Sequence, residues 1–207
     1  MFPSNPRHRL YLGVALLLAA IIGIYGLNRV SRKHVGEAAV AEASLSPFAA
    51  HARGQMAQFQ FHDAPKNVTL RAVRDGAGAE VALARWQGRV MLVNLWATWC
   101  PPCRAEMPEL GKLQAALGGA DFEVVTINLD SQTRQDKARE FLATAGEGHL
   151  AFYRDDEGAA REALNVPGLP ATILFDRQGR ELGRLLGPAP WAGADAQAMI
   201  KAVMAAQ

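Results

Sequence analysis

Cysteine is scarce in this chain of 207 residues, which contains only Cys100 and Cys103. A single pair excludes a framework of several disulfides. A disulfide that closes a ring of only four residues would restrict the unfolded chain little and stabilise the fold by about 2 kcal/mol. Histidine is also scarce, and no two of the five histidines lie three to five residues apart, as a structural zinc site would require. The spacing therefore favours a redox-active dithiol. A copper site built from Cys100, Cys103 and His149 is the alternative.

An excess of charge of one sign is lacking as well. The chain has 22 Lys and Arg against 20 Asp and Glu, a net charge of +2. This balance provides no strongly basic surface, so we expect no nucleic-acid partner. Half of the residues are hydrophobic, which is enough for a sizeable core, and the length suits one domain with an appendage. We find no internal repeat and expect a monomer.

Charged residues are absent from Leu10–Leu27, which is almost wholly apolar. A helix of this length extends about 27 Å, close to the hydrocarbon thickness of a bilayer. The segment therefore predicts one transmembrane helix. The alternative is a signal peptide cleaved near the A-x-A sequence at 39–41, although the apolar region of a signal peptide is usually about 7–15 residues long.

The basic residues around this segment are nearly balanced, because two arginines precede it and three basic residues follow it. A short tail before a large domain is typical of anchors whose N-terminus stays inside, so we place the domain outside the cytoplasm. The Ala-rich stretch after the anchor lacks strand alternation and is interpreted as a linker. The predicted organisation is a cytoplasmic tail over 1–9, an anchor over 10–30, a linker over 31–58 and a folded domain over 59–207.

Two apolar stretches frame the cysteines. Val90–Trp96 is typical of a central strand buried on both faces, and Pro101–Leu117 has the apolar spacing of a helix. Alternation over 68–73 and 80–83, around a turn at 75–78, predicts a hairpin. Further strands are expected over 122–129, 149–153, 171–175 and 181–186, and helices over 133–145, 159–164 and 194–206. This order indicates an α/β domain with a mixed sheet, helices on both faces and a C-terminal antiparallel hairpin.

Cys100 lies where the predicted strand gives way to the helix. Pro101 disfavours helical angles at the preceding residue and itself suits the first helical position. The positive end of the helix favours a thiolate, which predicts Cys100 as an exposed attacking thiol and Cys103 as a more buried resolving thiol. Because Pro101 and Pro102 lack N–H groups, Cys100 can accept a first-turn hydrogen bond essentially only from Cys103. We predict that this limited stabilisation of the thiolate makes the protein a better reductant.

The sequence resembles a known group at two places. Residues 93–108 read VNLWATWCPPCRAEMP and residues 169–176 read LPATILFD. Both resemble landmarks of the TlpA/ResA/CcmG group, which are membrane-anchored thiol–disulfide proteins of bacterial cell envelopes. The resemblance extends from about residue 60 onward, and the stretch GPAPW at 187–191 is most similar to TlpA. It implies a thioredoxin-like fold with an N-terminal β-hairpin and a central αβ insertion.

The resemblance also bears on acidic groups near the thiols. Glu106 follows Cys103 by one helical turn, and spacing alone favours a solvated side chain. The resemblance implies instead that Glu106 lies near the thiols and acts in proton transfer. Asn94 stands where thioredoxin has a buried aspartate, and Ala171 stands where some relatives have glutamate. Neither of these two positions supplies an acid in this chain.

A surface for target peptides is implied as well. The Leu169–Pro170 bond is expected to be cis and to face the disulfide, although only about 5–6% of X–Pro bonds are cis in general. An extended target would pair there with backbone groups and contact Trp99, Pro101 and Pro102. The redox centre is the cysteine pair itself, with no further cofactor and no metal.

We therefore predict a membrane-anchored reductant of protein disulfides in the bacterial inner membrane, with its catalytic domain in the periplasm. The resemblance implies a part in cytochrome oxidase or cytochrome c biogenesis. It implies protein substrates such as an apocytochrome or a copper-site assembly protein, and recharging by a membrane thiol-reductant donor. The alternatives are a copper-binding assembly factor and a disulfide-forming oxidant.

Overall fold

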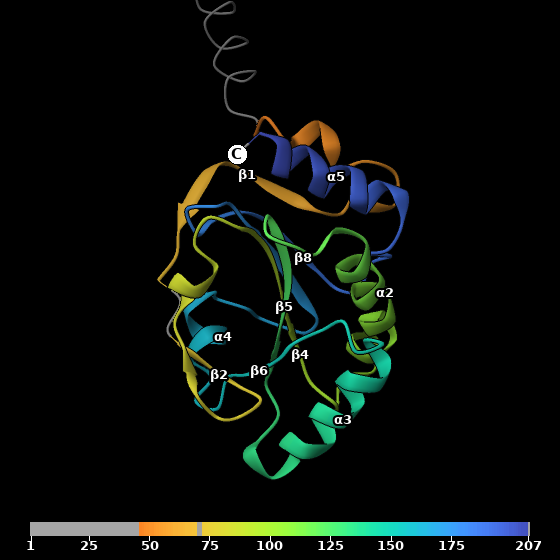
Figure 1. Ribbon diagram of the computed structural model, residues 1–207. Helices are drawn as coiled ribbons and strands as arrows, with labels where there is room; N and C mark the ends of the chain where they lie inside the picture. Colours follow the sequence, from red (N-terminus) through yellow and green to blue (C-terminus); the bar gives the residue numbers. More distant parts are fainter. Residues whose placement is uncertain (1–45, 70–71, 207) are drawn as a thin grey trace, which may run out of the picture. The chain divides into compact units, whose positions relative to one another are not determined.

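The computed structural model describes residues 46–69 and 72–206, whose path is drawn in Figure 1. Within these ranges, no helix is long and apolar enough to cross a membrane. The predicted tail over 1–9 and the predicted anchor over 10–30 lie outside the described residues.

A mixed sheet of eight strands forms the framework, in the order β1-β8-β7-β4-β5-β6-β2-β3. The central strand β4, Val90–Trp96, runs parallel to β5, Phe122–Asn128, and antiparallel to β7, Ala171–Phe175. Every residue of β4 is buried, as its near-continuous apolar run predicts. The other strands are β1 (Gln60–Asn67), β2 (Val73–Asp75), β3 (Glu80–Val81), β6 (Phe152–Arg154) and β8 (Arg180–Leu186).

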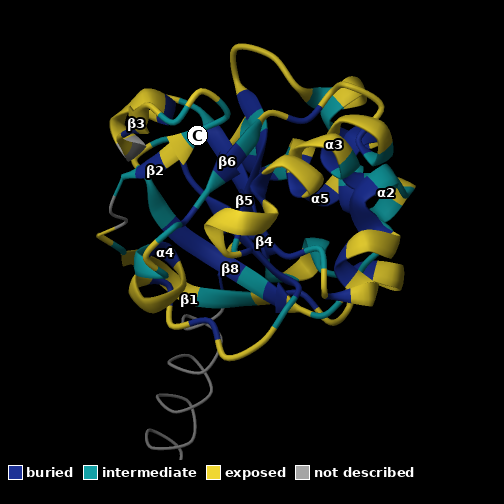
Figure 2. Ribbon diagram, turned by 90° about the horizontal axis from the view of Figure 1, so that it is seen from below, coloured by how far each residue is buried: buried dark blue, intermediate teal, exposed yellow. Residues whose placement is uncertain are grey.

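Helices cover both faces of the sheet, as predicted. Because side chains alternate along a strand, one set of β4 residues packs with α2, α3 and α5, and the other set packs with α4 and the 3₁₀ helix η3. Figure 2 shows the buried central strands β4 and β5 together with the exposed outer surfaces of the helices. The helices are α2 (Pro101–Leu117), α3 (Gln135–Ala145), α4 (Ala159–Ala163), α5 (Ala194–Ala205), η1 (Ala49–His51), η2 (Gly54–Met56), η3 (Leu83–Trp86) and η4 (Gln132–Arg134).

Three predicted elements match the structure residue for residue, namely β4, α2 and β7. The C-terminal hairpin of β7 and β8 is also confirmed, and α5 ends one residue before its predicted end. These elements have either a continuous apolar run or a strong helical period, so local pattern and tertiary environment agree.

Near the start of the domain, one predicted strand has the wrong bounds and another strand is not predicted. Among the described residues of the expected strand over 68–73, only Val73 belongs to a strand, β2, which pairs with β3 around the predicted turn. Strand β1 is missing from the predicted elements, because its sequence is polar and contains Pro65. Within the described sheet it pairs only with β8 and is therefore an edge strand, and an edge tolerates exposed side chains and proline.

The folded unit begins at Ser46, ahead of the boundary predicted at residue 59. Residues 46–58 contain η1 and η2. Phe48 and Met56 are buried in the apolar cluster that also contains residues of α5. Two buried apolar residues in an Ala-rich stretch produce no hydrophobic periodicity in the sequence. Only the tertiary structure shows that this segment belongs to the domain.

Candidate active site at the start of helix α2

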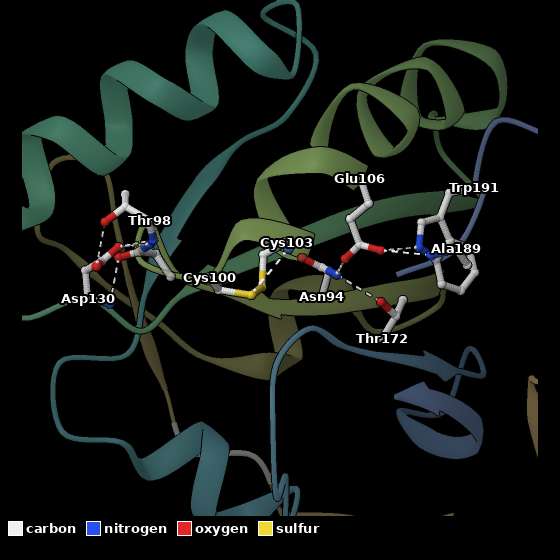
Figure 3. Close-up of a disulfide and its surroundings, with 10 residues drawn as sticks. Asn94, Thr98, Cys100, Cys103, Glu106, Asp130, Thr172, Ala189 and Trp191 are labelled. Atoms are coloured by element: carbon white, nitrogen blue, oxygen red, sulfur yellow. Dashed lines mark hydrogen bonds between the residues drawn. A yellow bond between two sulfur atoms is a disulfide. The ribbon is translucent and has the colours of Figure 1, made fainter. Parts of the chain in front are cut away.

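The two cysteines form a disulfide at the junction of β4 and α2, with their Cα atoms 5.3 Å apart (Figure 3). Cys100 is the N-cap of α2 and has an extended backbone, φ −98° and ψ 100°. This conformation is the one that a following proline favours. Pro101 and Pro102 occupy the first two helical positions, as predicted. The strand therefore delivers Cys100 to the positive end of a helix of 17 residues.

The prediction that Cys100 is exposed is wrong for the disulfide form. Cys100 is only 4% exposed and Cys103 is fully buried, so only the predicted order of exposure holds. Trp99, Pro101 and Pro102 beside it are exposed, and Trp99 is 57% exposed. The sequence neighbours of Cys100, rather than its own sulfur, supply the accessible surface.

The backbone N–H of Cys103 donates a hydrogen bond to Cys100 Sγ at 3.3 Å. It is the one hydrogen bond to this sulfur within the described part of the chain. The two preceding residues are prolines and cannot donate, so the predicted limit on first-turn donors is confirmed. Its effect on the reduction potential stays a prediction.

Asp130 fixes the loop between β4 and Cys100. Its carboxylate accepts hydrogen bonds from the backbone N–H of Thr98 and from the Thr98 hydroxyl, both at 2.8 Å, and from Asn128 at 2.8 Å. Asp130 lies just after β5, the parallel neighbour of β4, so the carboxyl ends of both strands meet here. Sequence reasoning missed this contact, although a polar pair at the ends of two predicted neighbouring strands is a usable signal.

Glu106 is buried, with only 3% of it exposed, and so is not the solvated side chain that spacing alone favours. Its Oε1 accepts a hydrogen bond from Asn94 Nδ2 at 2.8 Å. Its Oε2 accepts from Trp191 Nε1 at 3.1 Å and from the Ala189 backbone N–H at 3.2 Å. Burial raises the pKa of Glu106 from its ordinary value of 4.5 to about 7, and the hydrogen bonds from Asn94, Trp191 and Ala189 oppose that rise. Glu106 can therefore gain or lose a proton near neutral pH.

Asn94 and Thr172 complete this buried polar group. Asn94 lies on β4 and Thr172 faces it across the ladder on β7, where Asn94 Nδ2 donates to Thr172 Oγ1 at 2.9 Å. Sequence reasoning singled out Asn94 but missed Thr172 and the hydrogen bond from Trp191. Their partners lie far along the chain, and no local pattern connects them.

The Leu169–Pro170 peptide bond is cis, as the resemblance implies. Pro170 directly precedes β7, whose first residue pairs with Leu95 of β4, so this turn lies at the same end of the sheet as the disulfide. The Pro170 carbonyl accepts a hydrogen bond from Gly187 N–H at 2.9 Å, whereas the Leu169 backbone has no hydrogen-bond partner in the described segments. Leu186, next to this turn in the β7–β8 ladder, is 50% exposed.

The structure does not bring His149 together with the two cysteines. His149 lies in the exposed turn after α3, where its N–H donates to Gly146. No group of three His, Cys, Asp or Glu side chains suited to a metal ion occurs among residues 46–69 and 72–206. The copper set of Cys100, Cys103 and His149 therefore has no support in this geometry.

Comparison with known proteins gives consistent matches. The Redoxin family profile matches residues 62–200. A thiol:disulfide interchange protein DsbE homolog of Paracoccus denitrificans is 37% identical over 102 residues, which are 49% of this chain and 53% of that protein. The chain thus spans about half the length of the curated relatives it matches.

Solved structures agree with this match. A DsbF homologue from Corynebacterium diphtheriae is 26% identical with a TM-score of 0.57, covering 72% of this chain and 93% of that one. A thioredoxin family thiol:disulfide interchange protein from Chlorobium tepidum is 23% identical with a TM-score of 0.56, covering 68% and 97% of the two chains. The thioredoxin-like α/β fold is confirmed. The Paracoccus denitrificans relative and the Corynebacterium diphtheriae structure carry Dsb names, and none of the three is named TlpA, so the expected closeness to TlpA stays a prediction.

Proposed function

Because the chain belongs to the Redoxin family, we propose that it is a thiol–disulfide oxidoreductase whose redox centre is the Cys100–Cys103 pair. The observation that carries this proposal is the geometry of the pair, closed at the start of α2 with a titratable carboxyl group buried one turn further along. The predicted TlpA/ResA/CcmG-type membership and the names of the relatives, which are thiol:disulfide interchange proteins, agree with this chemistry.

In the reducing direction, the reduced protein attacks a disulfide of its target. The Cys100 thiolate, favoured by the helix N-terminus, forms a mixed disulfide and releases one target sulfur, which takes up a proton. Cys103 then attacks Cys100 Sγ, and the second target sulfur leaves. Two electrons and two protons pass to the target, and the Cys100–Cys103 disulfide forms.

Glu106 serves as the proton-transfer group of this exchange. Cys103 must lose its proton to act as the resolving nucleophile, and Glu106 is the buried acid one turn along the same helix. A carboxyl group with a pKa of about 7 can accept that proton near neutral pH.

The target peptide binds beside the disulfide as an extended segment. The backbone N–H and C=O of Leu169, which have no partner among residues 46–69 and 72–206, can pair with it as with an added strand. Trp99, Pro101, Pro102 and the turn at Pro170 provide apolar contacts around the sulfur. This arrangement favours protein disulfides over small-molecule disulfides as substrates.

The proposed biological setting is supported by the sequence and by the kind of relatives. The protein is anchored in the bacterial inner membrane by residues 10–30, with its domain in the periplasm, and it acts as a reductant in cytochrome c or cytochrome oxidase biogenesis. Its substrates are proteins such as an apocytochrome or a copper-site assembly protein. A membrane thiol-reductant donor returns it to the dithiol form.

Two measurements test this function. The reduced protein should reduce a model protein disulfide such as insulin, and Cys100→Ser should abolish the reaction while Glu109→Gln, a control on the outer part of α2, should not. Cys103→Ser should trap the target as a mixed disulfide that can be identified. A reduction potential of about −120 mV lies at the oxidising end of the known range. Such a value would contradict the proposal of a reductant and favour a disulfide-forming oxidant.

A further inference from the structure

The side-chain amide of Asn94 is buried, and its oxygen has no hydrogen-bond partner among the described residues. The residue is fully buried on β4, and its Nδ2 uses both hydrogens, donating to Glu106 Oε1 at 2.8 Å and to Thr172 Oγ1 at 2.9 Å. Its Oδ1 is buried and has no hydrogen-bond partner in the described residues. Most buried polar groups are hydrogen-bonded, so an exception beside a reactive group requires an explanation.

The free oxygen of this amide lies on the side of the cysteines. In Figure 3, the Asn94 side chain lies between Cys103 and Glu106, with its nitrogen toward Glu106 and its oxygen toward the disulfide. Strand alternation agrees, because Leu92 and Trp96, which flank Asn94 on the same face of β4, belong to the apolar cluster that contains both cysteines. The disulfide form offers this oxygen no hydrogen, because neither sulfur carries one.

We infer that Asn94 is a positioning residue that connects the two states of the cysteine pair to Glu106. When the disulfide is reduced, Asn94 Oδ1 accepts a hydrogen bond from the Cys103 thiol, while Nδ2 keeps its hydrogen bond to Glu106. This inference rests on the proposed function, since it assigns Asn94 a part in the same redox cycle.

The chemistry balances as follows. A protein dithiol reduces the pair, so the S–S bond breaks, the donor's two thiols become a disulfide, and two electrons and two protons reach Cys100 and Cys103. The new S–H of Cys103 is a weak donor, and Asn94 Oδ1 is an acceptor that lacked one. The contact keeps Cys103 protonated and aimed at the amide, and so leaves Cys100 as the first nucleophile.

Few polar groups other than Asn94 could connect Glu106 to the cysteines. The groups that hydrogen-bond to it are the Asn94 amide from β4, the Trp191 indole and the Ala189 backbone from the segment after β8. Thr172 on β7 accepts a hydrogen bond from the Asn94 amide, and Cys103 lies on α2, the same helix as Glu106. No charged side chain is paired with Glu106 in the described residues, so the amide is the direct polar link between the acid and the side of the thiols.

The test reads the Cys103 thiol directly, through its S–H stretching band in the infrared spectrum. The full-length chain carries Cys100→Ser, so that Cys103 is the only thiol. We expect a band at the lower frequency of a hydrogen-bonded thiol, a shift to the free-thiol frequency in Asn94→Leu, and no shift in the control Thr172→Val. A free-thiol frequency with Asn94 in place, or an unchanged band in Asn94→Leu, would overturn the inference.

An isosteric variant covers the case in which Asn94→Leu does not fold. Asn94→Asp keeps an oxygen but loses the N–H groups, so the S–H band should stay at the bonded frequency. A return to the free-thiol frequency in Asn94→Asp would count against the inference. The nitrogen half is tested by the carboxyl stretch of Glu106, whose titration midpoint should rise in Asn94→Leu and not in Thr172→Val; equal midpoints in both variants would contradict it.

These readouts are independent of turnover. If wild-type protein does not reduce insulin, the proposed function fails while the S–H band still reports the Asn94 contact. If insulin is reduced and the band is that of a free thiol, the proposed function stands and the role of Asn94 is refuted.

Discussion

Burial gives Glu106 a higher proton affinity than an exposed glutamate has. Its pKa is raised to about 7, although three donors favour its charged form. Desolvation therefore outweighs hydrogen bonding at this residue. The group is poised to exchange a proton near neutral pH, which an acid at its ordinary pKa could not do.

This shift makes stability depend on pH. The folded-state pKa exceeds the unfolded value of 4.5, so the stabilising effect of the bound proton is complete below about pH 4.5 and is lost as the pH rises through about 7. We expect the unfolding free energy of the oxidised protein to fall by up to about 3 kcal/mol more in wild type than in Glu106→Gln between pH 5 and 8. Urea unfolding at both pH values measures it, with Glu109→Gln as the control. Equal pH dependence in wild type and Glu106→Gln would refute the assignment.

Pro102 withholds a backbone donor from Cys100. An N-cap side chain accepts from the N–H of the second or third helical residue, and here only the third, Cys103, can donate. Pro102→Ala restores the missing N–H at the second position, so the thiolate is better stabilised and the reduction potential should become more oxidising by about 30 mV. Equilibration with dithiothreitol measures the potential. Pro101→Val, at the first position, should have a smaller effect, and an equal or more reducing potential in Pro102→Ala would contradict the argument.

At the scale of elements, the segment after β8 is joined to α2 through a side chain. Trp191 is fully buried, and its indole N–H donates to Glu106 while the ring packs in the apolar cluster beneath α2. Trp191 and Glu106 are 85 residues apart in the sequence, so this contact joins α2 to a distant part of the chain. The C-terminal segment is thus a structural part of the site and not only a cover for the sheet.

Removing this single donor should affect both the acid and the fold. Trp191→Phe keeps most of the ring but loses a hydrogen bond that favours charged Glu106, so the pKa of Glu106 should rise and stability at pH 8 should fall by about 1–3 kcal/mol. Carboxyl infrared titration and urea unfolding measure the two effects. Trp86→Phe is the matched control, because the buried Trp86 Nε1 has no partner in the described residues. A loss of stability as large in the control would show that ring volume, not the hydrogen bond, matters.

The elements also show how far the sequence could lead. β4, α2 and β7 are predictable because each has a strong local pattern that burial reinforces. The cysteines and Pro170 are predictable because they lie in short motifs at the ends of those elements. The hydrogen-bond partners of Glu106 are not, because Asn94, Ala189 and Trp191 surround it only after the sheet and the C-terminal segment have assembled.

At the scale of the whole molecule, the domain depends on residues that the sequence assigned to a linker. Phe48 and Met56 are buried against the cluster that includes α5. A chain cut at the predicted boundary would therefore expose apolar surface that is covered in the described structure.

Two truncations test this dependence. The fragment 46–207 should unfold with the free energy of the full chain, whereas 59–207 should lose about 3–5 kcal/mol, as expected when large core side chains are removed. Thermal and urea unfolding measure the difference. Met56→Ala in the fragment 46–207 should reproduce about half of the loss, and equal stability of the two fragments would show that residues 46–58 do not support the domain.

The burial of Cys100, at 4% exposure between exposed neighbours, also bears on how the disulfide form is reduced. A dissolved thiol that meets the molecule at random finds the Cys100 sulfur covered. A protein dithiol that first binds Trp99 and Pro101 can displace this cover and bring its own sulfur within reach. The reductant that reopens the disulfide is then selected by surface contact before any electron is transferred.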